Sequence, residues 1–369
     1  MSDKKPVGIG IIGCGNISGT YLKAAKDFPI LDIRAVADRH HPTAVLQGEA
    51  FGVPVRSVAD LLAADDIDIV LNLTIPQAHV EVGMAALAAG KHVYSEKPLA
   101  VTVSEGRKLI AEGERLGLRV GCAPDTFLGG AHQTCRDIVD SGALGQVVGG
   151  TAFFMCPGHE RWHPNPDFYY KSGGGPMLDM GPYYITQLVN LLGPVASVTG
   201  MASMLRKTRP ITSEPRNGEM IEVEVFTHVS GSLAFASGAI VQIVMSFDVA
   251  GHRHTPIEIY GTDATLLVPD PNHFGGQVET RAKNADWVDV PTTMPYWDGN
   301  FRSLGLADMA HAIRSKRPHR ASGALALHAL EVMAAVEDSA RTGQRIEIAT
   351  QPDRPAPLGD NIVNTILAH

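Results

Sequence analysis

The first third of the chain alternates short apolar runs with segments in which apolar residues recur at helical spacing. The apolar runs predict strands at residues 7–12, 31–38, 67–73, 92–96 and 119–123. The segments between them predict helices at residues 17–28, 43–51, 78–89 and 102–116. Strands that alternate with helices pair in parallel, and nearly continuous apolar runs are typical of strands covered on both faces. We therefore expect a parallel α/β sheet in this region.

The pattern changes beyond residue 125. A Gly-rich turn precedes a predicted helix at residues 176–192, and later runs alternate apolar and polar residues, which is typical of antiparallel strands with one solvent-facing side. These runs predict strands at residues 196–205, 221–228, 239–247, 257–260 and 264–268, and helices follow at 301–315 and 324–341. We expect an α/β domain over residues 1–124 and an α+β domain with an open, mostly antiparallel sheet over residues 125–369.

Length and composition limit the classes of protein that remain. The 369 residues, 44% hydrophobic and 19% charged, suffice for two or three globular domains. The net charge of −8 disfavours nucleic acid as the main partner, because phosphate backbones require clustered Lys and Arg. No apolar run is long enough to span a membrane, and the first one is too short and Gly-rich for a signal peptide. We expect a soluble, cytoplasmic protein without a membrane partner.

A glycine-rich turn joins the first predicted strand to the first predicted helix. Its sequence is Gly13-Cys14-Gly15-Asn16-Ile17-Ser18. Gly13 permits a tight turn, and Gly15 lets the backbone approach a pyrophosphate. The backbone N–H groups at Asn16 and Ile17 lie at the helix N-terminus, which favours an anion. The turn therefore predicts a dinucleotide site.

Asp38 ends the predicted strand at residues 31–38, at the distance from the glycines where an acidic residue binds the adenosine ribose. Its carboxylate would accept hydrogen bonds from the ribose hydroxyls and repel a 2′-phosphate, which favours NAD. Arg39 beside it leaves NADP open, because Arg can bind a 2′-phosphate or stack on adenine.

Three further motifs complete a family resemblance. They are Glu96-Lys97-Pro98, the segment Thr74-Ile75-Pro76-Gln77-Ala78-His79, and Gly173-Gly174-Gly175-Pro176-Met177-Leu178-Asp179-Met180-Gly181. With the glycine loop and Asp38, they resemble the Gfo/Idh/MocA oxidoreductase family over almost the whole chain. The resemblance implies a Rossmann domain, a C-terminal domain whose open sheet carries sugar-binding residues and subunit contacts, and a homodimer or homotetramer.

The resemblance also implies roles for individual residues. It implies a cis peptide before Pro98, with Lys97 reaching both the nicotinamide and the substrate hydroxyl. The residues that it places near the cofactor are Thr74, Pro76, His79, Glu96, Lys97 and Asp125. Asp125 stands where many relatives carry Asn, and it is expected on the nicotinamide or substrate side.

Asp179 and Tyr183 are four residues apart on a predicted helix, so they share one face. Many family members carry His at the position of Tyr183. A free phenol has a pKa of about 10, but a nearby Lys97 ammonium and a positive nicotinamide ring would both stabilise the phenolate. We expect Tyr183 with Lys97 to accept the hydroxyl proton and Asp179 to orient the hydroxyl. The alternative is that the Tyr183 ring only packs against its neighbours and that its hydroxyl is hydrogen-bonded within the protein.

The segment His159-Glu160-Arg161-Trp162-His163 matches the zinc-protease motif H-E-x-x-H, which requires a helix. Prolines at positions 157, 164 and 166 exclude a continuous helix, so we expect no metal. We instead expect a substrate-binding loop in which hydrogen-bond donors lie beside an aromatic ring. This combination suits a polyol or an anionic sugar. Its candidate residues are His159, Arg161, Trp162, His163 and Lys171. The alternative is a surface loop between the domains.

A second polar set follows the predicted strand at residues 239–247: Asp248, His252, Arg253 and His254. The resemblance places the end of this strand near the sugar site or the subunit interface, so His252 and His254 are substrate-binding candidates. The alternative for each histidine is a satisfied surface residue.

Together these features predict an NAD-dependent oxidoreductase that transfers a hydride between a sugar or polyol carbinol and nicotinamide. Two alternatives remain open. The first is a glycosidase that retains NAD and oxidises a sugar carbon transiently to allow elimination. The second is a non-catalytic NAD-binding sensor.

Overall fold

The computed structural model describes residues 5–359, which form two compact units. The described part of the first unit comprises residues 5–133, 294–327 and 355–359. The second unit comprises residues 134–293 and 328–354. The expected division at 124/125 differs from this arrangement, because the chain returns to the first unit after completing most of the second.

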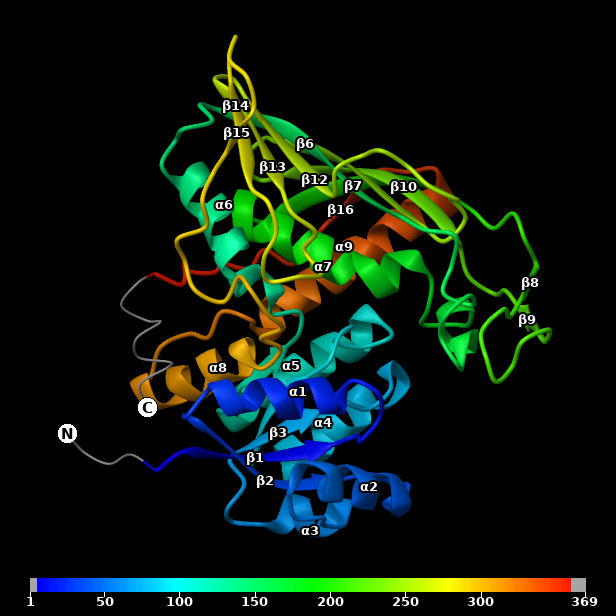
Figure 1. Ribbon diagram of the computed structural model, residues 1–369, viewed down its shortest axis with the longest axis vertical. Coiled ribbons are helices and arrows are strands. Elements are labelled where there is room, and N and C mark those ends of the chain that lie inside the picture. Colours follow the sequence, from blue (N-terminus) through cyan, green and yellow to red (C-terminus); the bar gives the residue numbers. More distant parts are fainter. Residues whose placement is uncertain (1–4, 360–369) are drawn as a thin grey trace. The chain divides into compact units, whose positions relative to one another are not determined.

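A five-stranded parallel sheet forms the centre of the first unit (Figure 1). Its order is β2-β1-β3-β4-β5. The strands are β1 (Val7–Ile12), β2 (Leu31–Ala37), β3 (Ile69–Asn72), β4 (His92–Ser95) and β5 (Val120–Cys122). Every residue of β1 and β3 is buried, as expected for strands covered on both faces. The predicted parallel fold is confirmed.

Helices of the first unit pack on this sheet. They are α1 (Ser18–Ala24), α2 (His41–Phe51), α3 (Val58–Ala63), α4 (His79–Ala88), α5 (Val103–Leu116) and α8 (Leu304–Ser315), with short 3₁₀ turns η1 (Ala25–Asp27), η2 (Pro76–Ala78) and η3 (Thr126–Leu128). Leu61, Leu87 and Leu109 from three of these helices join one core cluster with Val70 and Val93 of the sheet. Helix α3 was not predicted, because only six residues carry its pattern.

Segment 294–327 belongs to the first unit for a specific reason. Asp125, directly after β5, accepts hydrogen bonds from the backbone N–H groups of Ser303 and Gly305 at the start of α8. Asp308 within α8 is fully buried and paired with Arg317 and Arg320. The Asp125 contacts attach the start of α8 to the end of β5, whereas the Asp308 pairs join α8 to the segment that follows it.

A mixed nine-stranded sheet dominates the second unit, in the order β15-β14-β13-β12-β6-β11-β10-β7-β16. Strands β6 and β11 pair in parallel and the other neighbours are antiparallel. The strands are β6 (Val147–Met155), β7 (Val195–Ser203), β10 (His228–Phe235), β11 (Ile240–Ser246), β12 (Ile257–Gly261), β13 (Ala264–Val268), β14 (Glu279–Ala282), β15 (Val288–Asp289) and β16 (Ile346–Glu347). This confirms the expected open, mostly antiparallel sheet.

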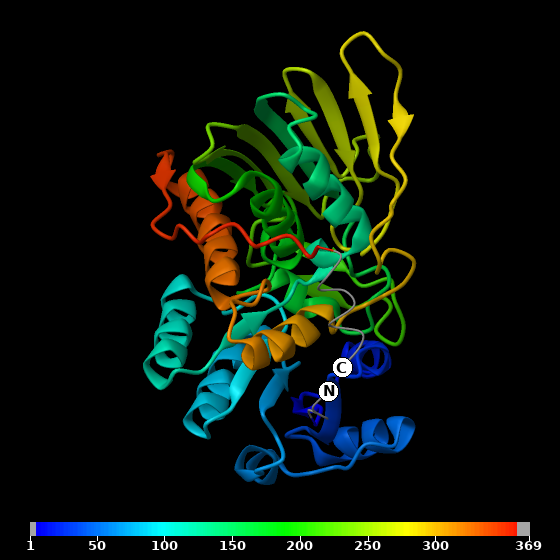
Figure 2. The ribbon, with the colours of Figure 1, turned by 90° about the vertical axis from the view of Figure 1, so that its left-hand side faces the viewer.

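Helix α7 (Pro176–Leu192) and most of α9 (Gly323–Thr342) lie along one face of the nine-stranded sheet (Figure 2). Helix α6 (Gly130–Asp140) and the 3₁₀ turn η4 (Pro166–Tyr170) complete the helical elements of this part of the chain. At Gly181 of α7, an added Cβ would lie 2.8 Å from the Met333 sulfur, so the glycine permits α9 to approach closely. No helix within residues 5–359 has the length and apolar character needed to cross a membrane.

Prediction and structure differ at two places in the second unit. The predicted strand at residues 221–228 divides into β9 (Met220–Glu222), which pairs with β8 (Thr208–Pro210), and the first residue of β10. Strand β6 was not predicted, because Gly149 and Gly150 interrupt its pattern. An added Cβ at either glycine would lie 2.2–2.3 Å from a carbonyl oxygen of a neighbouring strand, so tight strand contact explains both.

Candidate active site

The glycine loop of the first unit leaves room above its backbone. Gly13 has a φ of +103°, and an added Cβ there would lie 2.6 Å from the Leu73 carbonyl. At Gly15 an added Cβ would meet no atom within 4 Å, so the backbone faces open space. No side chain caps the start of α1. These features fit a pyrophosphate, which needs close backbone approach and free N–H donors.

Asp38 closes this loop through two backbone hydrogen bonds, and its contact with a ribose remains a prediction. One carboxylate oxygen accepts the Cys14 N–H at 2.8 Å, and the other accepts the His40 N–H at 2.8 Å. Burial and the Asp38 charge raise the pKa of the Cys14 thiol to about 11, so the thiol stays protonated. Arg39 beside Asp38 is exposed.

The Glu96-Lys97-Pro98 turn follows β4, and the Lys97–Pro98 peptide bond is cis, as the resemblance implies. Glu96 is 9% exposed. Its Oε1 accepts a 2.6 Å hydrogen bond from the Tyr21 hydroxyl, and its Oε2 accepts the Lys97 N–H at 2.9 Å. Burial and the Glu96 charge raise the pKa of Tyr21, so its phenol remains the donor. Glu96 therefore fixes the backbone that carries Lys97.

His79 joins two of the predicted cofactor segments. Its side chain is fully buried, with Nδ1 2.7 Å from the Pro98 carbonyl oxygen and Nε2 3.0 Å from the Thr74 carbonyl oxygen. Burial lowers the pKa of His79, although both carbonyls oppose this shift. Thr74 itself donates to Asn72 through its hydroxyl, and Pro76 begins η2. The structure thus gives His79 backbone partners within the protein, and direct contact with a cofactor stays a prediction.

Asp125 is 1% exposed, and its carboxylate accepts the two N–H groups at the start of α8, at 3.2 and 2.9 Å. Burial raises its pKa to about 6, although these hydrogen bonds oppose the shift. The residue therefore anchors α8 in this structure, and its predicted contact with nicotinamide or substrate remains a prediction.

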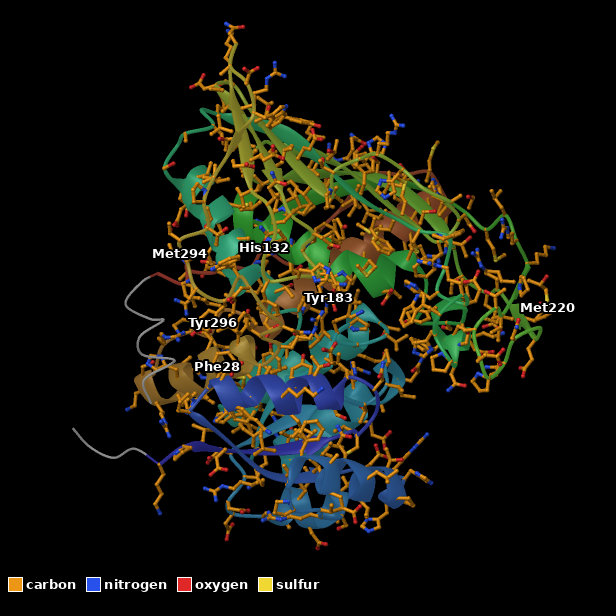
Figure 3. The ribbon with its side chains drawn as sticks, in the orientation of Figure 1. Phe28, His132, Tyr183, Met220, Met294 and Tyr296 are labelled. Atoms are coloured by element: carbon orange, nitrogen blue, oxygen red, sulfur yellow. The ribbon has the colours of Figure 1, made fainter. Side chains whose placement is uncertain are left out.

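In the second unit, three glycines precede α7 and let the preceding loop fold back on itself. Gly173 and Gly175 have φ of +86° and +92°, and the Gly175 N–H donates to the Tyr169 carbonyl at 2.7 Å. Asp179 and Tyr183 then follow on α7, and Figure 3 labels Tyr183. The Asp179 side chain is 14% exposed, and Tyr183 is 8% exposed.

The H-E-x-x-H segment forms turns rather than a helix, as its prolines predict. His159 Nε2 lies 3.0 Å from Asp179 Oδ2, and His159 Nδ1 accepts a 3.1 Å hydrogen bond from Trp162 Nε1. Within residues 5–359 no three His, Cys, Asp or Glu side chains are grouped to hold a metal ion. The segment therefore joins two predicted site residues, His159 and Trp162, to Asp179.

Glu160 of the same segment belongs to a buried ionic network. It accepts from Arg209 Nε at 2.7 Å and also accepts from the Tyr170 hydroxyl. Arg209 donates to Asp248 at 2.5 Å, and Asp248 accepts from the Thr227 hydroxyl at 2.5 Å. Arg209 is fully buried, so these two carboxylates must compensate its positive charge. Sequence reasoning missed Arg209 and Tyr170, because neither belongs to a recognisable motif.

The remaining predicted substrate residues lie at the surface or close to it. Exposed Arg161 donates through Nε to the Gly158 carbonyl at 3.1 Å, and His163 accepts the Asn165 N–H at 3.0 Å. Lys171 pairs with Glu224 at 2.8 Å. The exposed rings of His252 and His254 lie 6.1 Å apart, and His254 stacks on Phe153. Substrate contact by these residues remains a prediction.

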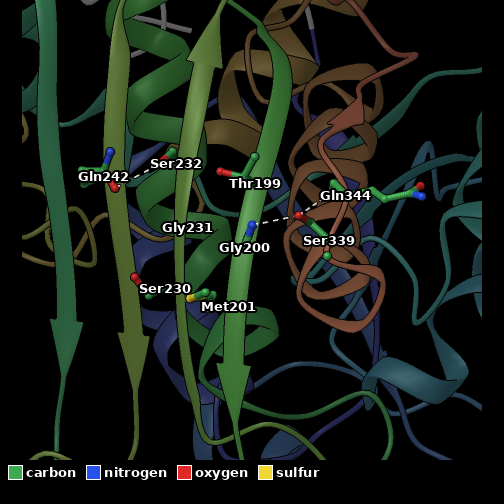
Figure 4. Close-up of a pocket in the computed structure, with 10 residues that line it drawn as sticks. Thr199, Gly200, Met201, Ser230, Gly231, Ser232, Gln242, Ser339 and Gln344 are labelled. Atoms are coloured by element: carbon green, nitrogen blue, oxygen red, sulfur yellow. Dashed lines mark hydrogen bonds between the residues drawn. The ribbon is translucent and has the colours of Figure 1, made fainter.

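A separate cavity of about 390 Å³ lies beside β7, β10, β11 and the end of α9 (Figure 4). Its lining residues are Thr199, Gly200, Met201, Ser230, Gly231, Ser232, Gln242, Ser339, Gly343 and Gln344. None of these side chains titrates near neutral pH, so the cavity offers no acid or base for catalysis.

Comparison with known proteins places this geometry in a family. Residues 7–123 match the model of the oxidoreductase family with an NAD-binding Rossmann fold. Residues 132–267 match the model of the GFO/IDH/MocA C-terminal domain.

Named relatives agree with the two models. The chain is 26% identical over 348 residues to 1,5-anhydro-D-fructose reductase of Ensifer adhaerens, covering 92% of this chain and 98% of that one. It is 34% identical over 270 residues to dTDP-3,4-didehydro-2,6-dideoxy-alpha-D-glucose 3-reductase of Saccharopolyspora spinosa, covering 72% and 75%. Levoglucosan dehydrogenase in complex with NADH and L-sorbose shares the fold, with a TM-score of 0.83 at 18% identity, covering 94% and 100%. The protein is therefore an NAD(P)-dependent oxidoreductase of the Gfo/Idh/MocA family.

Proposed function

We propose that this protein is an NAD-dependent dehydrogenase or reductase acting at a secondary alcohol carbon of a sugar or polyol. The observation that carries the proposal is that Lys97 and Asp179 are each held by a dedicated hydrogen-bonded support. The Lys97 backbone is fixed through Glu96, and Asp179 is paired with His159. Such support is typical of side chains that must meet a reacting group in a defined orientation. The reductase and dehydrogenase names of the relatives point to sugars as the substrate class.

The choice of NAD follows from the end of β2. The Asp38 carboxylate would accept hydrogen bonds from the ribose hydroxyls, and its charge would repel a 2′-phosphate. The loop at Gly13 and Gly15 would hold the pyrophosphate, since the backbone at Gly15 faces open space. We propose that the exposed Arg39 stacks on adenine rather than binding a phosphate.

When bound, the nicotinamide supplies the acceptor or donor of the hydride. The protein then has to move one proton and orient one hydroxyl. We propose that Tyr183 and Lys97 together take the hydroxyl proton as the C–H bond breaks, so that the carbinol becomes a carbonyl. Asp179 orients the same hydroxyl. The reverse direction returns the proton from the same pair to the carbonyl oxygen.

We also propose a homodimer or homotetramer that uses the open face of the nine-stranded sheet. Met201 on β7 is 80% exposed and Ile240 on β11 is 54% exposed. Light scattering of the purified protein tests this proposal, since a monomer at micromolar concentration would contradict it.

The decisive experiment incubates the protein with NAD⁺ and a panel of sugars, polyols and glycosides while NADH absorbance is recorded. NADH formation with a carbinol substrate is expected. Glycoside cleavage without net NADH would instead support a redox-assisted glycosidase. Binding of NAD⁺ without turnover across the panel would support a sensor.

A further inference from the structure

The His159 ring lies between two side chains with opposite hydrogen-bonding requirements. The Trp162 indole N–H can only donate, and it lies 3.1 Å from His159 Nδ1. Asp179 Oδ2 lies 3.0 Å from His159 Nε2. An ionised carboxylate can only accept, so each ring nitrogen faces a partner that determines its role.

These partners leave one consistent arrangement of protons. Nδ1 must present its lone pair to the indole N–H of Trp162. If Asp179 were protonated and donated to Nε2, both ring nitrogens would have to accept, which would require an imidazolate anion. We infer that Trp162 fixes His159 as the neutral Nε2–H tautomer, which in turn donates to Asp179 and holds it as an oriented carboxylate.

Other contacts hold the His159 ring in this position. Its ring centroid lies 4.4 Å from that of Tyr169 and 4.6 Å from that of Phe247. Its backbone N–H donates to the Tyr170 hydroxyl at 3.1 Å, and Tyr170 is itself bound to Glu160. The residue is 9% exposed. The imidazole is therefore held by contacts with two aromatic rings and by a hydrogen bond at its backbone.

This arrangement changes the role expected for His159. Both ring nitrogens are occupied by protein partners, so the side chain has no lone pair left to accept a substrate proton. His159 and Trp162 are positioning residues that act through Asp179. The consequence for turnover rests on the proposed function, because it assumes that Asp179 orients the reacting hydroxyl, whereas the tautomer does not depend on it.

The tautomer can be measured without any substrate. Protein carrying ¹⁵N-labelled histidine would be studied by long-range ¹H–¹⁵N correlation NMR at neutral pH, with a His159→Gln sample identifying the signal to assign. A protonated, pyrrole-type Nε2 and an unprotonated, pyridine-type Nδ1 are expected. A proton on Nδ1, in either the other tautomer or the imidazolium, would overturn the inference even if the enzyme is active.

Trp162→Phe tests the link to catalysis, because it keeps an aromatic ring and removes only the indole donor. We expect the Nδ1 signal to lose its single pyridine-type character. We also expect kcat to fall about tenfold, which corresponds to a rise of about 1.4 kcal/mol in the activation barrier. The Kd for NAD⁺ should be unchanged. Trp287→Phe, at a partly exposed tryptophan beside β15, is the matched control and should change kcat less than twofold. An unchanged kcat in Trp162→Phe would overturn the positioning role, and absence of all dehydrogenase activity would count against the proposed function alone.

Discussion

The Tyr21 hydroxyl donates a 2.6 Å hydrogen bond to the Glu96 carboxylate, although the two residues are 75 positions apart in the sequence. Tyr21 lies on α1, the helix that begins directly after the glycine loop, and Glu96 precedes Lys97. One buried hydrogen bond thus joins the expected phosphate loop to the turn that carries the proposed catalytic amine.

Tyr21→Phe removes this donor and leaves Glu96 Oε1 buried without it. We expect the free energy of unfolding to fall by about 1–3 kcal/mol, the cost of an unsatisfied buried acceptor, together with a lower kcat because the Lys97 turn loses its anchor. Urea unfolding and steady-state kinetics measure both effects. Tyr94→Phe is the matched control, since the Tyr94 hydroxyl is buried without a hydrogen-bond partner among the described residues. Equal stability losses in the two variants would contradict this account.

Lys97→Ala tests the amine itself. Loss of a group that shares in proton transfer should lower kcat by about 10²–10⁴-fold, while the Kd for NAD⁺ stays within a few-fold of wild type. Isothermal titration and initial-rate measurements separate the two quantities. Lys108→Ala, at an exposed position on α5, provides the control. Turnover close to that of wild type in Lys97→Ala would remove the assignment.

Asp125→Asn should change how stability depends on pH. Burial raises the pKa of Asp125 from its ordinary value of 3.8 to about 6, so the folded protein binds this proton more tightly than the unfolded chain does. Stability is therefore lost as the pH rises from about 4 through 6, and the loss above that window is roughly 3 kcal/mol. The variant has no such proton. Relative to the wild-type value, the free energy of unfolding of the variant should therefore increase as the pH rises from 4.5 to 7.5. Profiles of stability against pH that run parallel for the two proteins would refute the prediction.

Arg209→Leu should be strongly destabilising. The substitution leaves Glu160 and Asp248 buried without their shared cation, and breaking a buried ionic network in this way costs about 3–5 kcal/mol. Arg216→Leu is the control, because its pairs with Asp167 and Glu219 are partly exposed and should contribute little to stability. Denaturant unfolding of both variants measures the difference, and similar losses would argue against a special role for the buried network.

Hydrophobic periodicity predicted the elements that are long or continuously apolar. The structure has β1, α7 and β13 at the predicted bounds. Glycines obscured β6, since a strand that needs Gly149 and Gly150 for close backbone contact lacks the side chains that reveal a strand. The start of β10 was not recognised for a different reason. The alternation of apolar and polar residues continues from β9 across the turn before β10.

Candidate site residues could be named from the sequence where a motif carries its own chemistry, as in the glycine loop and Glu96-Lys97-Pro98. The contacts between distant segments that support these motifs could not be named. Tyr21 looked like an ordinary core residue of a helix, and Arg209 like one of several basic residues in a polar segment. Their roles arise from tertiary contacts with Glu96 and Glu160, which no local pattern records.

The central claim is that Lys97 and Tyr183 act on the same substrate hydroxyl, and a double-mutant cycle on the hydride-transfer rate tests it most directly. The rate would be measured in single-turnover experiments with wild type, Lys97→Ala, Tyr183→Phe and the double variant. Residues that act as a unit lose little more together than the more damaging single change alone. We predict that result, and losses that multiply across the two sites would contradict the account.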